Sequence, residues 1–232
     1  MCGRYSLLCI DDLGNRFRVH NPMIGSRSRF NISPGTRQPV IVAGAGGREL
    51  VQMQWGLIPG HVIASGTSRP FINARAETLT ERPVFARLLA SNRCLIPASG
   101  FFEWKQVRTQ KIPYYFHIPD QPVFAFAGLW DEWQDPAGTV LPGYTVITTE
   151  PNSLVASVHT RMPVILSREN EALWLADGSL PQGSPGTLLT PYPPEAMEMY
   201  PVTDLVNTPS VDDERVVRPL PSSAGMQTFL PE

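Results

Sequence analysis

The second residue of the chain is a cysteine, and this position gives it a chemistry that an internal cysteine lacks. Removal of Met1 would leave Cys2 with both a free α-amine and a thiol, which together form a β-aminothiol. The ordinary pKa is about 7.7 to 8.0 for the amine and about 8.5 for the thiol, so much of the amine is unprotonated near neutral pH. Such a pair attacks an aldehyde through nitrogen and then closes through sulfur into a thiazolidine, or acts as an N-terminal nucleophile on an amide.

The alternative is an ordinary cysteine behind a retained Met1. An intact Met1 turns the Cys2 nitrogen into an amide nitrogen, which is neither basic nor nucleophilic. The thiol alone would give only a reversible hemithioacetal. The sequence therefore predicts that an active species begins at Cys2, after trimming by an aminopeptidase or by self-cleavage.

Three later segments carry polar side chains that suit this chemistry. Asn73 and Arg75 lie two residues apart, where an amide can orient a reacting carbonyl and a guanidinium can hold an anion. Glu103 lies among large apolar side chains, where desolvation would raise its pKa and make it a usable proton shuttle. His159 precedes Arg161 by two residues at an expected helix-to-strand junction. Each also has a structural alternative: a backbone cap for Asn73, a solvated strand face for Glu103 and a satisfied polar group for His159.

The basic residues are unevenly distributed and are mostly arginine. Residues 1–100 carry 12 Arg and no Lys against 5 acidic residues, whereas residues 101–232 carry 7 basic and 16 acidic side chains. Because arginine grips phosphate or carboxylate bidentately, the first interpretation is a phosphate-binding face in the first half. The other is a solvated acidic half, with arginines at unrelated surface positions.

Length and cysteine content bound the class of protein. A chain of 232 residues can bury a sizeable core, as one β-rich domain or two small ones. No apolar run approaches the roughly 20 residues of a membrane span, and we expect no export signal. The three cysteines, an odd number without CxxC spacing, argue against a disulfide framework or a structural zinc site and favour a reducing cytosol.

These residues must be positioned by many short elements. We expect a short helix over 11–17, a hairpin of strands at 39–43 and 49–55, and a mobile loop that ends at Pro70. A helix over 80–90 with Pro83 in its first turn precedes five strands, which we expect at 94–98, 101–104, 114–118, 123–129 and 144–148.

The last third of the chain predicts a helix over 152–158, a strand over 162–166 and a helix capped by Ser167, with Leu173 and Trp174 facing the core. Residues 178–194 form an irregular connection, and valines at 202, 206, 216 and 217 suggest a late strand pair. The 24 prolines favour short strands over long helices. The predicted fold is α+β, with a predominantly antiparallel, barrel-like sheet and a few short helices.

Six sequence segments form an ordered series of motifs: MCGRY at 1–5, NISPGT at 31–36, WGLIP at 55–59, NARAET at 73–78, GFFEW at 100–104 and HTRMPVIL at 159–166. Taken in this order, they resemble the motifs of the SRAP family, the SOS-response-associated peptidases or abasic-site processing proteins. The resemblance runs from Cys2 to about Asn207 and implies a single SRAP-like domain over 1–232, with a core at 1–210 and a tail at 211–232.

The resemblance implies a protein that binds single-stranded DNA at an abasic site and links Cys2 to the deoxyribose aldehyde as a thiazolidine. Such a link would shield the lesion during the DNA damage (SOS) response. The implied roles are the nucleophile for Cys2, orientation of amine and aldehyde for Asn73, acid/base for Glu103, and sugar ring opening and reversal for His159. Lyase-like and autopeptidase (protease, hydrolase) activities follow from the same residues.

The resemblance also implies the DNA-binding residues. Arg4, Arg75 and Arg161 would hold the flanking phosphates. Asn31, Trp55 and His61 complete the expected set. His61 stands where the family usually has aromatic bulk, so its weaker stacking leaves open how this chain engages junctions of single and double strands.

Two rival functions stay open at this point. An N-terminal-nucleophile glutaminase or amidohydrolase also begins with MCG, but usually continues with Ile, where this chain has Arg4. A noncatalytic single-strand binding module would use the arginines and the 21 aromatic residues. We expect a monomer in the cytoplasm, on the nucleoid when bound to DNA, with no metal, no cofactor and no membrane partner.

Overall fold

The computed structural model describes residues 2–8, 11, 13–21, 27–58, 70–134, 138–176, 178, 180 and 184–221. Five strands at its centre close into a barrel. The strands are β3 (Arg37–Gly44), β4 (Gly47–Trp55), β6 (Arg93–Ala98), β9 (Phe124–Gln134) and β10 (Val140–Thr149). Each pairs with its neighbours in the order β10-β4-β3-β6-β9, and β9 pairs again with β10; only the β4–β10 pairing is parallel.

Local sequence explains why the first barrel strands form a hairpin. Gly44 lies opposite Gly47, so Ala45 and Gly46 make the two-residue turn, and Gly47 has a φ of 122° that favours glycine. Every residue of β6 is buried, because the strand lies inside the barrel wall and is covered from outside. Its run of apolar residues is typical of a strand that is buried on both faces.

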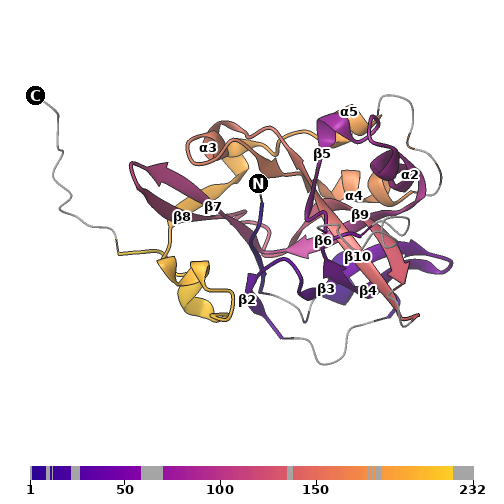
Figure 1. Cartoon of the computed structure of the whole chain (residues 1–232), viewed down its shortest axis with the longest axis horizontal. Helices are drawn as coiled ribbons and strands as arrows, with labels where there is room; N and C mark the ends of the chain where they lie inside the picture. Colours follow the sequence, from indigo (N-terminus) through magenta and orange to yellow (C-terminus); the bar gives the residue numbers. More distant parts are fainter. Residues whose placement is uncertain are drawn as a thin grey trace, which may run out of the picture.

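A second sheet of five strands carries the N-terminus. Its order is β13-β8-β7-β1-β2 and all its pairings are antiparallel. Figure 1 shows β7 and β8 at the left of the molecule and the barrel strands at the right, with β1 between them. The strands are β1 (Tyr5–Leu7), β2 (Arg29–Ile32), β7 (Gly100–Val107), β8 (Gln110–His117) and β13 (Glu198–Pro201).

Three short strands extend the barrel sheet towards the site. β5 (Asn73–Arg75) runs parallel to β10, β11 (Met162–Pro163) pairs with the end of β10, and β12 (Ile165–Leu166) pairs with β9. β10 therefore pairs with four strands, which are β4, β5, β9 and β11. The barrel core contains Tyr5 and Trp55, whose ring centroids lie 5.1 Å apart.

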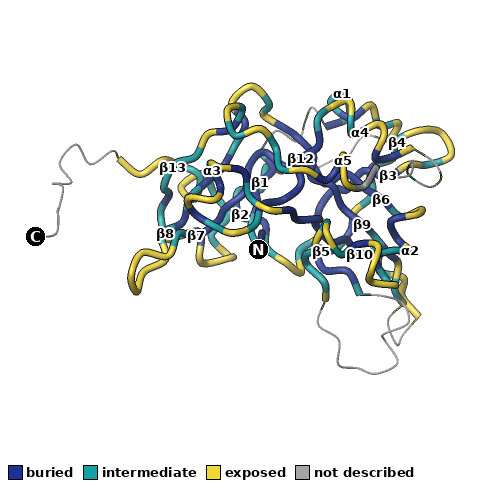
Figure 2. Tube along the Cα trace, turned by 90° about the horizontal axis from the view of Figure 1, so that it is seen from above, coloured by how far each residue is buried: buried dark blue, intermediate teal, exposed yellow. Residues whose placement is uncertain are grey.

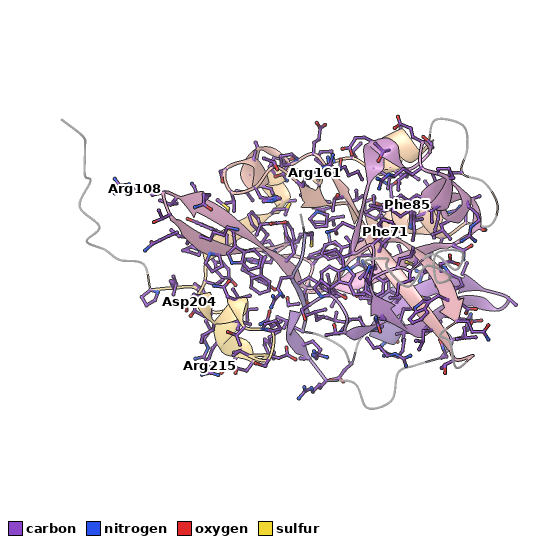
Figure 3. All side chains as sticks on the ribbon, viewed as in Figure 1. Phe71, Phe85, Arg108, Arg161, Asp204 and Arg215 are labelled. Carbon is purple, nitrogen blue, oxygen red and sulfur yellow. The ribbon has the colours of Figure 1, made fainter. Side chains whose placement is uncertain are left out.

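Five short helices cover the sheets. They are α1 (Leu13–Phe17), α2 (Pro83–Ser91), α3 (Ser153–Ala156), α4 (Arg168–Leu175) and α5 (Ser184–Leu188). Pro83 begins α2, where its missing N–H costs nothing, and Ser167 caps α4 by accepting from Asn170 N. In Figure 3, Phe85 of α2 lies beside Phe71, with ring centroids 5.5 Å apart. The described residues also form the 3-10 helices η2 (Ala76–Thr78), η3 (Pro194–Ala196), η4 (Asp204–Asn207) and η5 (Glu214–Val216).

The predicted fold class, a predominantly antiparallel, barrel-like α+β protein with short helices, is confirmed. The hairpin, the helix that begins at Pro83 and the five middle strands are also observed, with shifted ends. The segment predicted as one strand over 162–166 is split into β11 and β12, on either side of Val164. The mobile loop predicted before Pro70 lies mostly outside the described residues, which omit 59–69.

Three predictions about the later part of the chain are wrong. Leu173 is 54% exposed, because α4 buries the side chains of Glu171, Trp174 and Leu175 instead. The late strand pair is absent from the described residues: the valines lie in and around η4 and η5, where Thr203 and Asp213 cap the 3-10 turns. The connection over 178–194 contains α5 and begins η3.

No helix in the described part of the chain is long and apolar enough to cross a membrane. The division into a single domain with a core at 1–210 and a tail at 211–232 stays a prediction. Residues 204–217 lie against the second sheet, where Val206 and Val216 join Phe102 and Tyr115 in a small apolar cluster.

Candidate active site

The N-terminal segment runs beside the strand that carries Glu103. β1 pairs with β7, and the Phe102 N–H donates to the Arg4 carbonyl at 3.0 Å. Cys2 is fully buried at this place. Burial, followed by the charge of Glu103, raises the pKa of the Cys2 thiol far above its usual value. The thiol is therefore neutral near pH 7.

Asn73 holds the backbone of Cys2. The parallel pairing of β5 with β10 places Asn73 opposite Val146, and its Nδ2 donates to the Cys2 carbonyl at 2.8 Å. The Oδ1 atom of Asn73 is buried and accepts no hydrogen bond from the residues that the structure describes. The structure thus brings Cys2 and Asn73 together and leaves one amide acceptor available beside them.

Glu103 is a carboxylic acid set into the core. Side chains alternate along β7, so Glu103 follows Phe101 towards the main core while Phe102 faces the smaller cluster. Its side chain is 3% exposed, and burial raises the pKa of Glu103 to about 7. A group with this pKa can both give and accept a proton near neutral pH.

His159 faces Glu103 from the segment between α3 and β11. Its Nε2 lies 3.7 Å from Glu103 Oε2, too far for a good hydrogen bond but close enough to share a small substrate atom. The backbone N and O of Arg161 both lie 3.1 Å from Nδ1 and fix the orientation of the ring. Burial lowers the pKa of His159, so the imidazole is neutral at pH 7.

The side chain of Asn31 holds the guanidinium group of Arg4 in place. Arg4 Nη1 donates to Asn31 Oδ1 at 2.8 Å and to the Val206 carbonyl at 2.9 Å. Asn31 is 1% exposed, and its Nδ2 donates to three carbonyls of the segment 206–211. Direct DNA contact by Asn31, as predicted, does not fit this burial; the geometry suits a residue that positions Arg4.

Trp55 also lies inside the molecule. It is 0% exposed, and its Nε1 donates to the Ile72 carbonyl at 2.9 Å. A buried indole cannot stack on a base, so Trp55 supports the strand that leads to Asn73 and does not fit the predicted DNA contact. His61 lies outside the described residues, and its predicted role stays a prediction.

The other two predicted phosphate ligands differ in their surroundings. The Arg161 fork donates to both oxygens of Glu77, at 2.6 and 2.9 Å, and to the Thr148 carbonyl at 2.6 Å. Figure 3 shows Arg161 close to β5 in the upper half of the molecule. Arg75 is exposed, and no carboxylate of the described residues lies within 4 Å of it. Arg75 is therefore the more available of the two for a phosphate.

A depression of about 490 Å³ opens onto Glu103 and His159. Its other lining residues are Trp104, Lys111 and Asn207, and Trp104 Nε1 donates to Asn207 Oδ1 at 2.8 Å. Sequence reasoning assigned no role to these three. Trp104 lies inside a motif already noted and Lys111 is one of only two lysines, but no local pattern points to Asn207.

Comparison with known proteins identifies the family of this chain. Residues 1–209 match the family described as SOS response associated peptidase (SRAP). The chain belongs to the SRAP family. The family resemblance predicted from the six motifs is thus confirmed.

Two relatives of this SRAP chain are both named abasic site processing protein. The chain is 38% identical to the abasic site processing protein YoqW of Bacillus subtilis (strain 168), over 94% of this chain and 99% of YoqW. It is 31% identical to the abasic site processing protein HMCES of Xenopus tropicalis, over 77% of this chain and 62% of that protein. A crystal structure of a protein from Bacteroides thetaiotaomicron matches with a TM-score of 0.85 at 30% identity, covering 94% of this chain and all of that one.

The residues of the site can move protons and hold an anion. Glu103, whose pKa is near 7, and the neutral imidazole of His159 line the depression, and the neutral thiol of Cys2 is buried on the N-terminal segment beside the strand of Glu103. Among the residues the structure describes, no group of three or more His, Cys, Asp or Glu side chains is arranged to hold a metal ion.

Proposed function

We propose that this protein binds single-stranded DNA at an abasic site and joins Cys2 to the open-chain sugar aldehyde as a thiazolidine. The observation that supports this most is the meeting of Cys2 and Asn73 with a buried Glu103 that faces His159 across 3.7 Å. The abasic site processing proteins among its relatives favour the same lesion.

The amine acts first in this mechanism. Once Met1 is removed, the neutral Cys2 nitrogen attacks the aldehyde carbon and one of its protons passes to the carbonyl oxygen, which becomes a hydroxyl group. Glu103 protonates this hydroxyl so that it leaves as water, and the second proton of the nitrogen returns to Glu103 as the imine forms. The thiol sulfur then adds to the imine carbon, and its proton passes to the imine nitrogen. Because the raised pKa keeps the thiol neutral, sulfur is the poorer first nucleophile.

Asn73 and His159 have separate tasks in this scheme. The free Oδ1 of Asn73 accepts a hydrogen bond from the Cys2 amine and so orients its lone pair towards the aldehyde. His159, neutral and fixed by the backbone of Arg161, protonates or deprotonates the sugar oxygen as the furanose ring opens. Reversal of the link would use the same groups in the opposite order.

The DNA backbone would cross the exposed rim. Arg75 lies two residues after Asn73 on the same strand, so its side chain points to the same face of β5. Lys111, which is exposed, and Trp104 line the depression and supply a cation and an aromatic wall, and the exposed Arg75 supplies a second cation from β5. A sugar without a base leaves room for the thiazolidine ring.

The experiment that tests this function separates the Met1-bearing and Met1-free forms by intact mass and incubates each with abasic single-stranded DNA. A denaturing gel should show a heat-stable adduct only for the form that begins at Cys2. Cys2→Ala should abolish that adduct while the protein stays folded by circular dichroism. Equal crosslinking by a form that keeps Met1, or by Cys2→Ala, would refute the mechanism. Glutamine hydrolysis without an adduct would favour the amidohydrolase function instead.

A further inference from the structure

A second cavity, of about 630 Å³, lies away from the Cys2 site. In Figure 2, α1, α4 and β4 lie together along one edge of the molecule, and β5 lies towards the opposite edge. The cavity lies among these three elements. Its charged and polar lining residues are Asn15, Arg16, Arg18, His20, Arg48, Arg168 and Glu171.

The only carboxylate among the described lining residues is already neutralised. Glu171 is 1% exposed, and its two oxygens accept from the two terminal nitrogens of Arg16 at 3.1 and 2.5 Å. The distance from Arg48 Nη1 to Glu171 Oε2 is 3.7 Å, so a second guanidinium also lies near this carboxylate. No described carboxylate lies within 4 Å of Arg18 or Arg168. The lining therefore holds four guanidinium groups against one carboxylate.

Arg18 holds its place in the lining at a conformational cost. Its φ of 55° lies in the left-handed region, where a residue other than glycine costs roughly 1 kcal/mol or more. This is the position just past α1, where glycine is usual. The chain beyond it is tied to β4, because Val19 forms a bridge with Arg48 and His20 N donates to the Arg48 carbonyl at 3.2 Å. An observed strained residue that contributes charge to a cavity favours a functional origin.

The shape of the cavity favours a compact ligand. Its volume lies in the range of small-molecule sites, and its described lining includes no aromatic side chain except the imidazole of His20. His20 reaches over Gly47, where a Cβ atom would lie 2.6 Å from His20 Nε2. The lining thus offers forked donors for phosphate oxygens and little for stacking a base.

We propose that the cavity between α1, α4 and the β3–β4 hairpin binds a compact anion with two adjacent phosphate groups, the chemistry of pyrophosphate or of the diphosphate end of a nucleotide. Arg18, Arg48 and Arg168 bind the phosphate oxygens. The Arg16–Glu171 pair forms the floor and fixes the spacing of the two elements that carry the ligands.

Isothermal titration with pyrophosphate tests this site. The wild-type protein should bind with a saturable isotherm that weakens as salt increases. The double variant Arg18→Asn with Arg168→Ala should lose at least tenfold in affinity. Its crosslinking to abasic single-stranded DNA should match that of the wild type, which separates this site from the proposed function.

The chain offers a matched control for the strained arginine. Arg108 is also exposed and also left-handed, with a φ of 53°, but lies at the tip of the β7–β8 hairpin, as Figure 3 shows. Arg108→Asn removes the same charge, and asparagine tolerates the same backbone conformation. It should change pyrophosphate affinity less than twofold.

Two results would overturn the proposal. The first is no saturable binding of pyrophosphate by the wild type, and the second is an equal loss of affinity in Arg108→Asn and in the double variant. A short thymidine oligonucleotide, titrated in parallel, gives the first result its meaning: if oligonucleotide affinity falls in the double variant while pyrophosphate does not bind, the cavity belongs to an extended nucleic-acid surface.

Discussion

Two carboxylates are buried to almost the same depth in this molecule, and their surroundings differ. Glu171 is 1% exposed and accepts hydrogen bonds from both terminal nitrogens of Arg16, so the guanidinium charge balances the charge of the carboxylate. Glu103 is 2% exposed and faces a neutral imidazole at 3.7 Å, and its pKa rises to about 7. Burial alone therefore does not define a catalytic acid: Glu171 is paired with a guanidinium that matches its charge, whereas desolvation at Glu103 raises the pKa of that carboxyl group towards neutral pH.

The difference also separates structure from chemistry. A buried pair that satisfies both charges holds α1 and α4 together, whereas a buried carboxyl group beside Cys2 weakens the fold whenever it ionises. Strained or costly groups of this kind are typical of functional sites.

The largest effect is expected for Glu103→Gln. The amide keeps the size of the side chain but cannot carry the proton, so crosslinking to abasic single-stranded DNA should slow by about 10²- to 10⁴-fold. Quench-flow or timed denaturing gels measure the rate, and fluorescence anisotropy measures DNA affinity, which should change less than threefold. A variant that loses affinity but keeps its rate would assign Glu103 to binding.

Glu171→Gln should destabilise the fold and leave the rate of crosslinking unchanged. Removing the carboxylate leaves the nearly buried guanidinium of Arg16 without its charge partner, which typically costs about 3 to 5 kcal/mol. Urea unfolding should show this loss at every pH between 5 and 8. Crosslinking per folded molecule should stay within twofold of the wild type, since Glu171 lies in the other cavity. A slower rate at full folding would mean that the two carboxylates are coupled.

The pH dependence of stability should reveal the raised pKa of Glu103. A carboxyl group with a raised folded-state pKa binds more protons when folded than when unfolded, so stability is lost as pH rises from the unfolded value, about 4.5, through about 7. This corresponds to about 3 kcal/mol. Glu103→Gln should therefore be more stable than the wild type at pH 8 and about equal at pH 4.5. Parallel thermal melts of the two proteins across this range provide the measurement. A constant difference across the range would contradict the raised pKa.

The sequence predicted the behaviour of Glu103 but not the burial of Glu171. The apolar neighbours of Glu103 predicted desolvation, and the structure bears out the raised pKa. Nothing near Glu171 predicted its burial, because its partner Arg16 lies 155 residues away. The same pair explains why Leu173 was placed in the core wrongly: the paired Glu171 takes the buried face of α4.

The predictions at the site that do not fit the structure have a similar cause. Motif order identified Cys2, Asn73, Glu103 and His159, and the structure brings the four together. A motif match does not show whether a polar or aromatic residue is exposed or buried, so the resemblance predicted DNA binding by Asn31 and Trp55 although both lie inside. Their roles depend on hydrogen bonds to distant backbone carbonyls, which leave no trace in local sequence patterns.

Arg75 gives the smallest expected effect and extends the contrast to cations. Both terminal nitrogens of Arg161 donate to the carboxylate of Glu77. Arg75, in contrast, is exposed, and no described carboxylate lies within 4 Å of it. If Arg75 holds one phosphate of a single strand, Arg75→Ala should reduce the slope of log K against log salt by about 0.7 and weaken binding severalfold. Titrations of an abasic oligonucleotide at four salt concentrations provide the slope.

Arg168→Ala is the matched control, because it removes an equally exposed arginine from the other cavity. Its slope should equal that of the wild type, since counterions are released only where a phosphate is neutralised. If both variants lower the slope alike, the salt dependence reports the net charge of the protein rather than a contact at Arg75. The rim of the Cys2 site would then need another cation, for which Lys111 in the wall of the depression is the next to replace.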